Sequence, residues 1–246
     1  PTNMPIALNH AMIRRALGDT LAHFDPSGQA PASSDLVLVG HSMGGVIARL
    51  MVSSTDQSLV QLAADRSRLT PQQIKRIDPM LRFEPFPHVS RAIFIAAPHR
   101  GTSVAGGRLG RWMAGFIRFP VTVLEELAHT LAPNAAASSH ESLGHIPNNS
   151  VDNLDENDPF VRAAADFPIS AQVNYHSIVA QANAEVALAD SDDGLVPYRS
   201  AHLPGAQSEK IIISGHSVQQ SAAAVLEIQR ILREDIALRE AHFMQP

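Results

Sequence analysis

A run of branched apolar residues, followed at once by a serine between glycines, is the feature that most constrains the fold of this chain. The run is Leu36-Val37-Leu38-Val39, and Gly40-His41-Ser42-Met43-Gly44-Gly45 follows it. Such a continuous apolar run is typical of a strand with neighbours on both faces. Because helically spaced apolar residues follow Gly45, the sequence predicts a buried strand that turns sharply into a helix.

Ser42 stands at the centre of this turn, with Gly40 two residues before it and Gly44 two residues after it. This G-x-S-x-G spacing is that of a nucleophile elbow, which exposes a serine on a tight strand-to-helix turn. Glycine at both positions removes Cβ atoms that we expect to collide across the turn. An ordinary strand-to-helix turn is the alternative interpretation. The strand before the motif and the helix after it favour a nucleophile.

A serine hydroxyl needs a base, usually histidine, which a carboxylate in turn orients. Asp192-Asp193 follows a predicted strand over 173–181, and His216 follows a predicted strand over 210–214. Open α/β sheets place their chemistry at the carboxyl ends of their strands. The sequence therefore predicts a triad of Ser42, one of the two aspartates, and His216.

The remaining pattern is an alternation of helices and strands. A helix is expected over 6–24 and a further strand over 91–97. A C-terminal helix is expected from Ser217 onward. Its expected core-facing residues are Val218, Ala222, Val225, Ile228, Ile231, Leu232 and Ile236. Strands separated by helices predict a mostly parallel α/β sheet with right-handed crossovers.

With these motifs in this order, the chain resembles the α/β-hydrolase superfamily and, within it, the bacterial lipases and esterases. The resemblance covers most of the chain, and four stretches carry it: Gly40 to Gly44, Ala97 to Gly101, Asp193 to Pro197, and Gly215-His216. It implies an α/β-hydrolase fold, a mostly parallel sheet flanked by helices, in a single domain over residues 1–246.

The resemblance also implies roles for individual residues. Ser42, Asp193 and His216 are the implied catalytic triad. Asp193 is preferred to Asp192 because it precedes a Gly-x-Val step, whereas Asp192 is expected to cap its own turn. The backbone N–H of Met43 is the implied oxyanion donor that follows the nucleophile.

The chain departs from the family in the position of the elbow, which in the family follows several strands. Here only the predicted helix over 6–24 and a loop precede the elbow strand. We therefore expect the sequence to be N-terminally incomplete, a C-terminal portion of a hydrolase domain that lacks the N-terminal strands. The second oxyanion donor is then expected upstream of Pro1. The outer edge of strand 36–39 is expected to be open.

The segment over 102–168 is longer than a crossover requires and is expected to form a cap or lid insertion. It contains Trp112 and Phe116, which are candidates for binding an acyl chain. Packing of these side chains onto the core is an equal alternative. His41 and Arg100 are the other candidates for substrate contact, with a structural role and an ion pair as their respective alternatives.

Composition excludes several classes of function. The net charge of -5 is not that of a nucleic-acid-binding surface. The sequence contains no apolar run of the roughly 20 residues that a membrane span needs. It has no cysteine, and His140, His145 and the acidic run over 152–158 lack a recognised metal-ligand spacing. No metal or cofactor is expected, and neither localisation nor oligomeric state is indicated.

The function that this pattern predicts is acyl transfer by a serine nucleophile. The chain is expected to be a carboxylic ester hydrolase that acts on a small-molecule or lipid ester through an acyl-enzyme. An acyltransferase with the same triad is one alternative. The other is a non-catalytic hydrolase-like scaffold that binds an apolar ligand or a partner.

Overall fold

A four-stranded parallel sheet forms the centre of the computed structural model, which describes residues 6–55, 72, 78, 81–104 and 154–243. The strand order is β1-β2-β3-β4. The strands are β1 (Leu36–His41), β2 (Val89–Ile95), β3 (Asn174–Gln181) and β4 (Ser208–Ile213). The helices are α1 (Ile6–Phe24), α2 (Met43–Met51), α7 (Pro159–Ala165), α8 (Tyr198–Ala201) and α9 (Ala222–Phe243). Short 3-10 turns occupy Pro31–Ser33, Leu188–Asp190 and Val218–Gln220.

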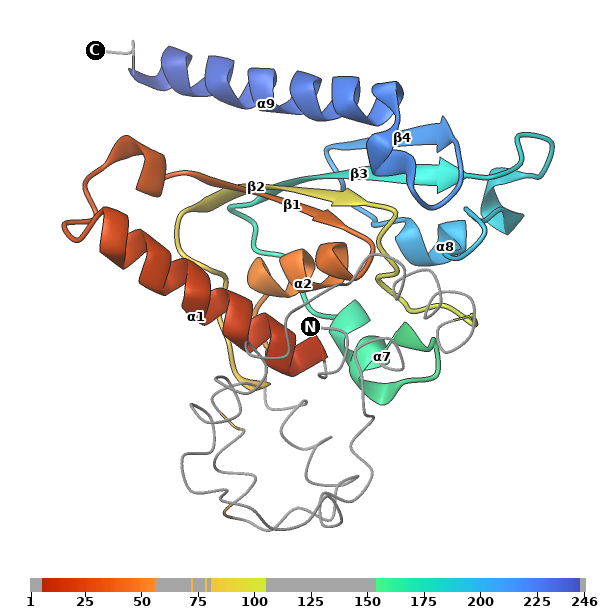
Figure 1. Ribbon diagram of the computed structural model, residues 1–246, viewed down its shortest axis with the longest axis horizontal. Coiled ribbons are helices and arrows are strands. Elements are labelled where there is room, and N and C mark those ends of the chain that lie inside the picture. The colour runs from red at the N-terminus through yellow and green to blue at the C-terminus, as the bar shows by residue number, and fades with distance from the viewer. Residues whose placement is uncertain (1–5, 56–71, 73–77, 79–80, 105–153, 244–246) are drawn as a thin grey trace, which may run out of the picture.

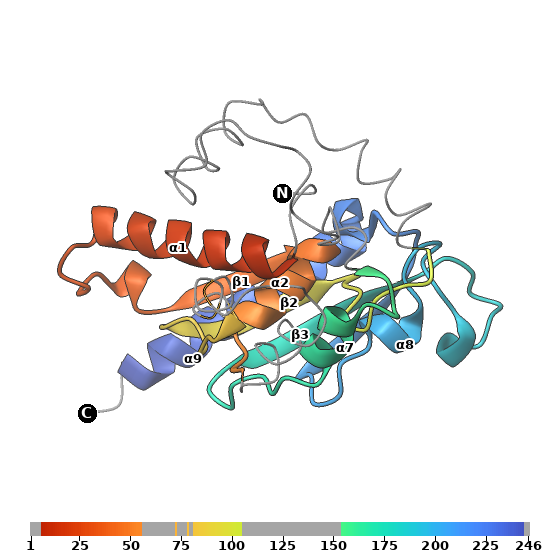
Figure 2. The ribbon, with the colours of Figure 1, turned by 90° about the horizontal axis from the view of Figure 1, so that it is seen from below.

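Helices cover both faces of this sheet (Figure 1). Alternate residues of β2 point to opposite faces: Phe94 packs in the cluster that includes α2, and Ile93 packs in the cluster that includes α9. The view in Figure 2 looks onto the face that α1, α2 and α7 cover. The prediction of a parallel sheet flanked by helices is confirmed (Figure 1).

The predicted boundaries differ from the structure by a few residues, for local reasons. β2 ends at Ile95 rather than at residue 97 because Ala96 has a φ of 45°, which a strand does not accommodate. The C-terminal helix begins at Ala222, not at Ser217. Ser221 is extended, and its Oγ accepts a hydrogen bond from the N–H of Ala224 at 3.1 Å, so it caps the helix.

The predicted core-facing side of the C-terminal helix is partly wrong. Val225 and Ile236 are 54% and 55% exposed. The buried positions of α9 are Ala224, Ile231 and Asp235, which lie on one stripe of the helix. The carboxylate of Asp235 can lie on this buried stripe because the buried side chain of Arg91 binds it. Hydrophobicity alone therefore misplaced the stripe.

β1 is an edge strand within the part of the chain that the structure describes, where it pairs only with β2. Val39 is 50% exposed, so the strand is not buried on both faces there. The open outer edge agrees with the expectation from the sequence. Among the described helices, none has the length and apolar character that crossing a bilayer would need.

Most of the expected cap insertion, residues 105–153 with Trp112 and Phe116, lies outside the described residues. Its last part contains α7. Asp158 caps this helix by accepting hydrogen bonds from the N–H groups of Phe160 and Val161. The lid and its contacts therefore stay predictions.

Candidate active site

Ser42 occupies the turn between β1 and α2 in a conformation that side chains rarely adopt. Its φ is 54° and its ψ is −126°, which strains any residue with a Cβ. The N–H of Ser42 donates to the carbonyl of Ile95 at 2.9 Å, and its own carbonyl accepts from Gly45 N–H at 2.9 Å. The strained turn is thus fastened to β2 on one side and to the first turn of α2 on the other.

Of the two glycines that flank Ser42, one has the expected role and the other does not. A Cβ on Gly40 would lie 2.4 Å from the carbonyl oxygen of Gly44, so the close approach expected at Gly40 is present. A Cβ on Gly44 would meet nothing within 4 Å outside its own helix, so the expected collision there is wrong. Gly45 is the second restricted position, because a Cβ added there would lie only 2.4 Å from the Cβ of Ala97. The absence of a Cβ at Gly45 therefore allows α2 to pack closely against the residues that follow β2.

The side chains of Ser42, His216 and Asp193 form one continuous hydrogen-bonded chain. Nε2 of His216 lies 2.8 Å from Oγ of Ser42, and Nδ1 of His216 lies 2.7 Å from Oδ2 of Asp193. A carboxylate only accepts, so Nδ1 carries the proton and Nε2 is left to accept from the serine hydroxyl. The three residues are 3%, 4% and 4% exposed, respectively. They follow β1, β4 and β3 at the carboxyl edge of the sheet.

Asp193 and Asp192 make different hydrogen bonds. Oδ1 of Asp193 accepts from the N–H groups of Leu195 at 2.9 Å and Val196 at 2.7 Å, which leaves Oδ2 for His216. Oδ1 of Asp192 accepts from Gly194 N–H at 2.7 Å, within its own turn. Both carboxylates therefore make the contacts that the sequence predicted for them. The two turn bonds hold the Asp193 carboxylate in one orientation.

Met43 is the first residue of α2, where a backbone N–H has no acceptor within the helix. Its N–H follows Ser42 directly, and its side chain packs in the core. This arrangement suits the expected oxyanion donor. The second donor, expected upstream of Pro1, lies outside the described residues and stays a prediction.

Of the other two described candidates for substrate contact, His41 lies next to the triad and Arg100 follows the end of β2. Nε2 of His41 lies 2.9 Å from the backbone carbonyl oxygen of His216. Burial is the main cause that lowers the pKa of His41. The guanidinium of Arg100 is exposed and donates to the main-chain carbonyl of His202 at 3.4 Å. This partner is not the carboxylate that the expected ion pair would have. Substrate binding by either residue stays a prediction.

Thr102 is a site residue that sequence reasoning missed. It is fully buried, and its Oγ1 donates to the carbonyl of Leu195 at 2.6 Å. This bond joins the loop after β2 to the turn that carries Asp193. The signal was available, because Thr102 directly follows the motif Pro98-His99-Arg100-Gly101.

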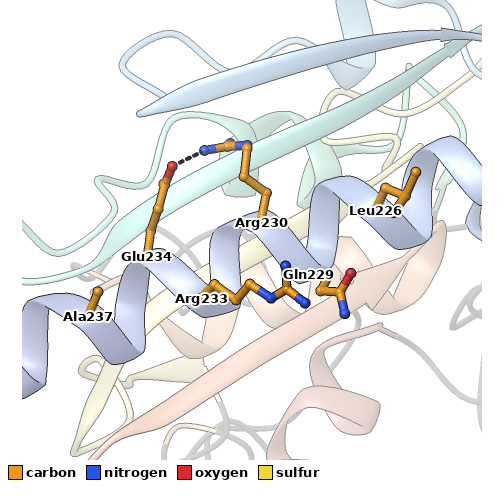
Figure 3. Close-up of a pocket in the computed structure, with 6 residues that line it drawn as sticks. All are labelled: Leu226, Gln229, Arg230, Arg233, Glu234 and Ala237. Carbon is orange, nitrogen blue, oxygen red and sulfur yellow. Dashed lines mark hydrogen bonds and ion pairs between the residues drawn. The ribbon is translucent and has the colours of Figure 1, made fainter.

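Two surface hollows over the described residues contain no member of the triad. One is a groove along α9, where Arg230 pairs with Glu234 beside Arg233 (Figure 3). The other is lined by residues that include Thr55, Glu84 and Phe167. In the described part of the chain, no three histidine, aspartate or glutamate side chains gather as a metal site would require. Neither of these two hollows therefore locates the candidate site, whereas the chemistry of the triad does.

Comparison with known proteins places most of the chain in one family. The alpha/beta hydrolase family matches residues 5–228. The mature form of lipase BlEst2 from Bacillus licheniformis is 17% identical, with 94% of this chain and 75% of that chain covered at a TM-score of 0.49. The metagenomic carboxyl esterase MGS0156 is 18% identical, with 87% and 52% covered at a TM-score of 0.45. The Staphylococcus hyicus lipase is 14% identical, with 86% and 72% covered at a TM-score of 0.44. A comparison with curated protein sequences gave no match.

Proposed function

This chain belongs to the alpha/beta hydrolase family, and we propose that it is a serine hydrolase that cleaves carboxylic esters. One observation carries the proposal: the unbroken hydrogen-bonded chain from Oγ of Ser42 through His216 to Asp193. All three side chains are buried, so water competes little for these bonds. A binding scaffold needs no such alignment of a nucleophile, a base and a carboxylate.

In the first half of the proposed reaction, Nε2 of His216 takes the hydroxyl proton of Ser42 as Oγ attacks the ester carbonyl carbon. The Asp193 carboxylate stabilises the imidazolium that forms. The N–H of Met43 donates to the carbonyl oxygen as it becomes an anion. One such donor contributes about 2.7–4 kcal/mol to the stability of the transition state.

The tetrahedral intermediate then collapses. The bond between the carbonyl carbon and the alcohol oxygen breaks, and Nε2 of His216 gives its proton to the leaving alcohol. Ser42 keeps the acyl group as an ester. His216 next takes a proton from water, whose hydroxide attacks the acyl carbon, and returns that proton to Oγ as the acid leaves.

Labelling and product analysis test this proposal. A fluorophosphonate probe should modify the wild-type protein and should not modify Ser42→Ala. The wild type should hydrolyse p-nitrophenyl esters, and Ser42→Ala should not. Hydrolysis retained by Ser42→Ala would contradict the proposal. An unlabelled and inactive wild type would indicate a binding scaffold. Preferred formation of a new ester when an alcohol is added would indicate an acyltransferase.

A further inference from the structure

His41 connects the strand that carries the nucleophile to the loop that carries the base. It is the last residue of β1, and its Nε2 lies 2.9 Å from the backbone carbonyl oxygen of His216. The two imidazole rings lie 5.1 Å apart between centroids and are tilted by 44°. The contact therefore joins two residues that are 175 positions apart in sequence. One of them, His41, directly precedes the nucleophile Ser42.

The carbonyl oxygen can only accept, so Nε2 of His41 must carry a proton and donate it. Burial disfavours the charged form of this ring. A neutral donor suits the site, because a second positive charge would oppose the imidazolium that forms on His216 during the reaction. His41 therefore has the properties of a neutral hydrogen-bond donor to the main chain.

The bond from His41 reaches a loop that lies between a strand and a helical turn. Backbone bonding to the neighbouring strand reaches Ser214, whose N–H donates to the carbonyl of Gln181 at 3.0 Å. Helical bonding begins with the N–H of Gln220, which donates to the carbonyl of Ser217 at 3.1 Å. His216 lies between these two bonds. Its side-chain bonds to Ser42 and Asp193 orient the ring, whereas the bond from His41 holds the backbone from which the ring projects.

We infer that His41 is a positioning residue that holds the main-chain carbonyl of His216 and so keeps Nε2 of His216 within reach of the Ser42 hydroxyl. This inference rests on the proposed esterase function. It differs from a substrate contact, because His41 then acts through the base and is expected to affect turnover for every ester alike. A displacement of about 1 Å at a reacting group costs up to roughly 10²-fold in rate.

Three substitutions separate this role from the alternatives. His41→Gln keeps an amide N–H the same number of bonds from the backbone as Nε2, so it can still donate to the carbonyl. His41→Met has similar length and no donor. His41→Asn is polar but too short to reach the carbonyl, and it carries the test if the methionine variant does not fold. Circular dichroism and thermal melting identify the folded variants.

We expect His41→Met and His41→Asn to lower kcat by about 10- to 100-fold, as misplacement of the base predicts. KM should stay within about twofold, and labelling by the fluorophosphonate should slow in parallel with kcat. The loss should be the same for p-nitrophenyl butyrate and p-nitrophenyl octanoate. His41→Gln should recover most of the lost kcat.

Two results would overturn the positioning role. One is an unchanged kcat in a folded His41→Met or His41→Asn variant. The other is a rise in KM that depends on acyl length, which would assign His41 to substrate binding. Failure of the proposed function has a separate signature, because the wild type itself would then be neither labelled nor active.

Discussion

At the carboxyl end of the sheet His216 lies between an aspartate and a serine, whereas at the amino end His176 lies between an arginine and a serine. Nε2 of His176 lies 2.6 Å from Nη1 of Arg91, and its Nδ1 lies 2.8 Å from Oγ of Ser208. Nε of Arg91 donates to Oδ1 of Asp235 on α9 at 2.8 Å. Both histidines are buried, and both make two side-chain bonds.

The charge of the partner separates the two histidines. A guanidinium only donates, so Nε2 of His176 accepts and the ring is neutral. Burial, reinforced by the positive charge of Arg91, lowers the pKa of His176 to about 4. Beside Asp193, by contrast, Nδ1 of His216 donates to a carboxylate, which leaves Nε2 to accept from the Ser42 hydroxyl. Burial alone therefore does not distinguish a base from a structural histidine, whereas the charge of the neighbouring group does.

The largest effect should follow from removing the nucleophile. We expect Ser42→Ala to lower kcat on the order of 10⁶-fold, because triad members act as one unit. Stability should change little, since the serine hydroxyl is small. Ester hydrolysis measured beside a thermal melt checks both parts. A large loss of stability would show that the carboxyl end also holds the fold together and would weaken the comparison.

Replacement of the carboxylate should have the next largest effect. Asp193→Asn should lower kcat by about 10⁴-fold, because an amide no longer holds Nδ1 of His216 in its protonated form. Asp192→Asn is the matched control, since the bond that this side chain makes among the described residues lies within its own turn. Its kcat should stay within a few-fold of wild type. Equal losses in the two variants would remove the distinction between the aspartates.

At the amino end, stability should change while activity does not. Arg91→Met leaves the Asp235 carboxylate buried without its partner and should lower the free energy of unfolding by about 3–5 kcal/mol. Urea denaturation measures this loss. The kcat of the remaining folded protein should equal that of wild type. A matched double variant, Arg91→Met with Asp235→Leu, should recover part of the stability because no unpaired charge remains.

The smallest effect concerns pH. The pKa of His176 is lowered to about 4 in the folded protein, below the ordinary value of 6.5, so the unfolded chain binds more protons between these values. The free energy of unfolding should therefore fall as pH falls from about 6.5 toward 4, by up to about 1.4 kcal/mol per pH unit for this one group. Urea denaturation at pH 7, 6 and 5 should show a weaker slope for His176→Gln than for wild type. An identical slope would contradict the neutral assignment.

The sequence predicted the triad because its motifs are local. The strand, the glycines and Ser42 are consecutive, Asp193 lies in a motif shortly after one predicted strand, and His216 directly follows another. The amino-end network has no such pattern, because Arg91 and Asp235 are 144 residues apart and only the folded chain brings them together. The contact of Gly45 with Ala97 escaped prediction for the same reason. Long-range pairing was thus predictable where each partner lies in a recognisable local motif, as in the triad, and was not predictable where no motif marks the partners.

The length of β3 has a consequence for how this protein can change over generations. His176 lies near the start of the strand and Gln181 at its end, about 16 Å apart at the usual rise per residue. Effects of substitutions separated by more than about 10 Å usually add without coupling. Selection can therefore alter the temperature tolerance of the molecule through Arg91, His176 and Asp235 while its turnover of substrate stays constant.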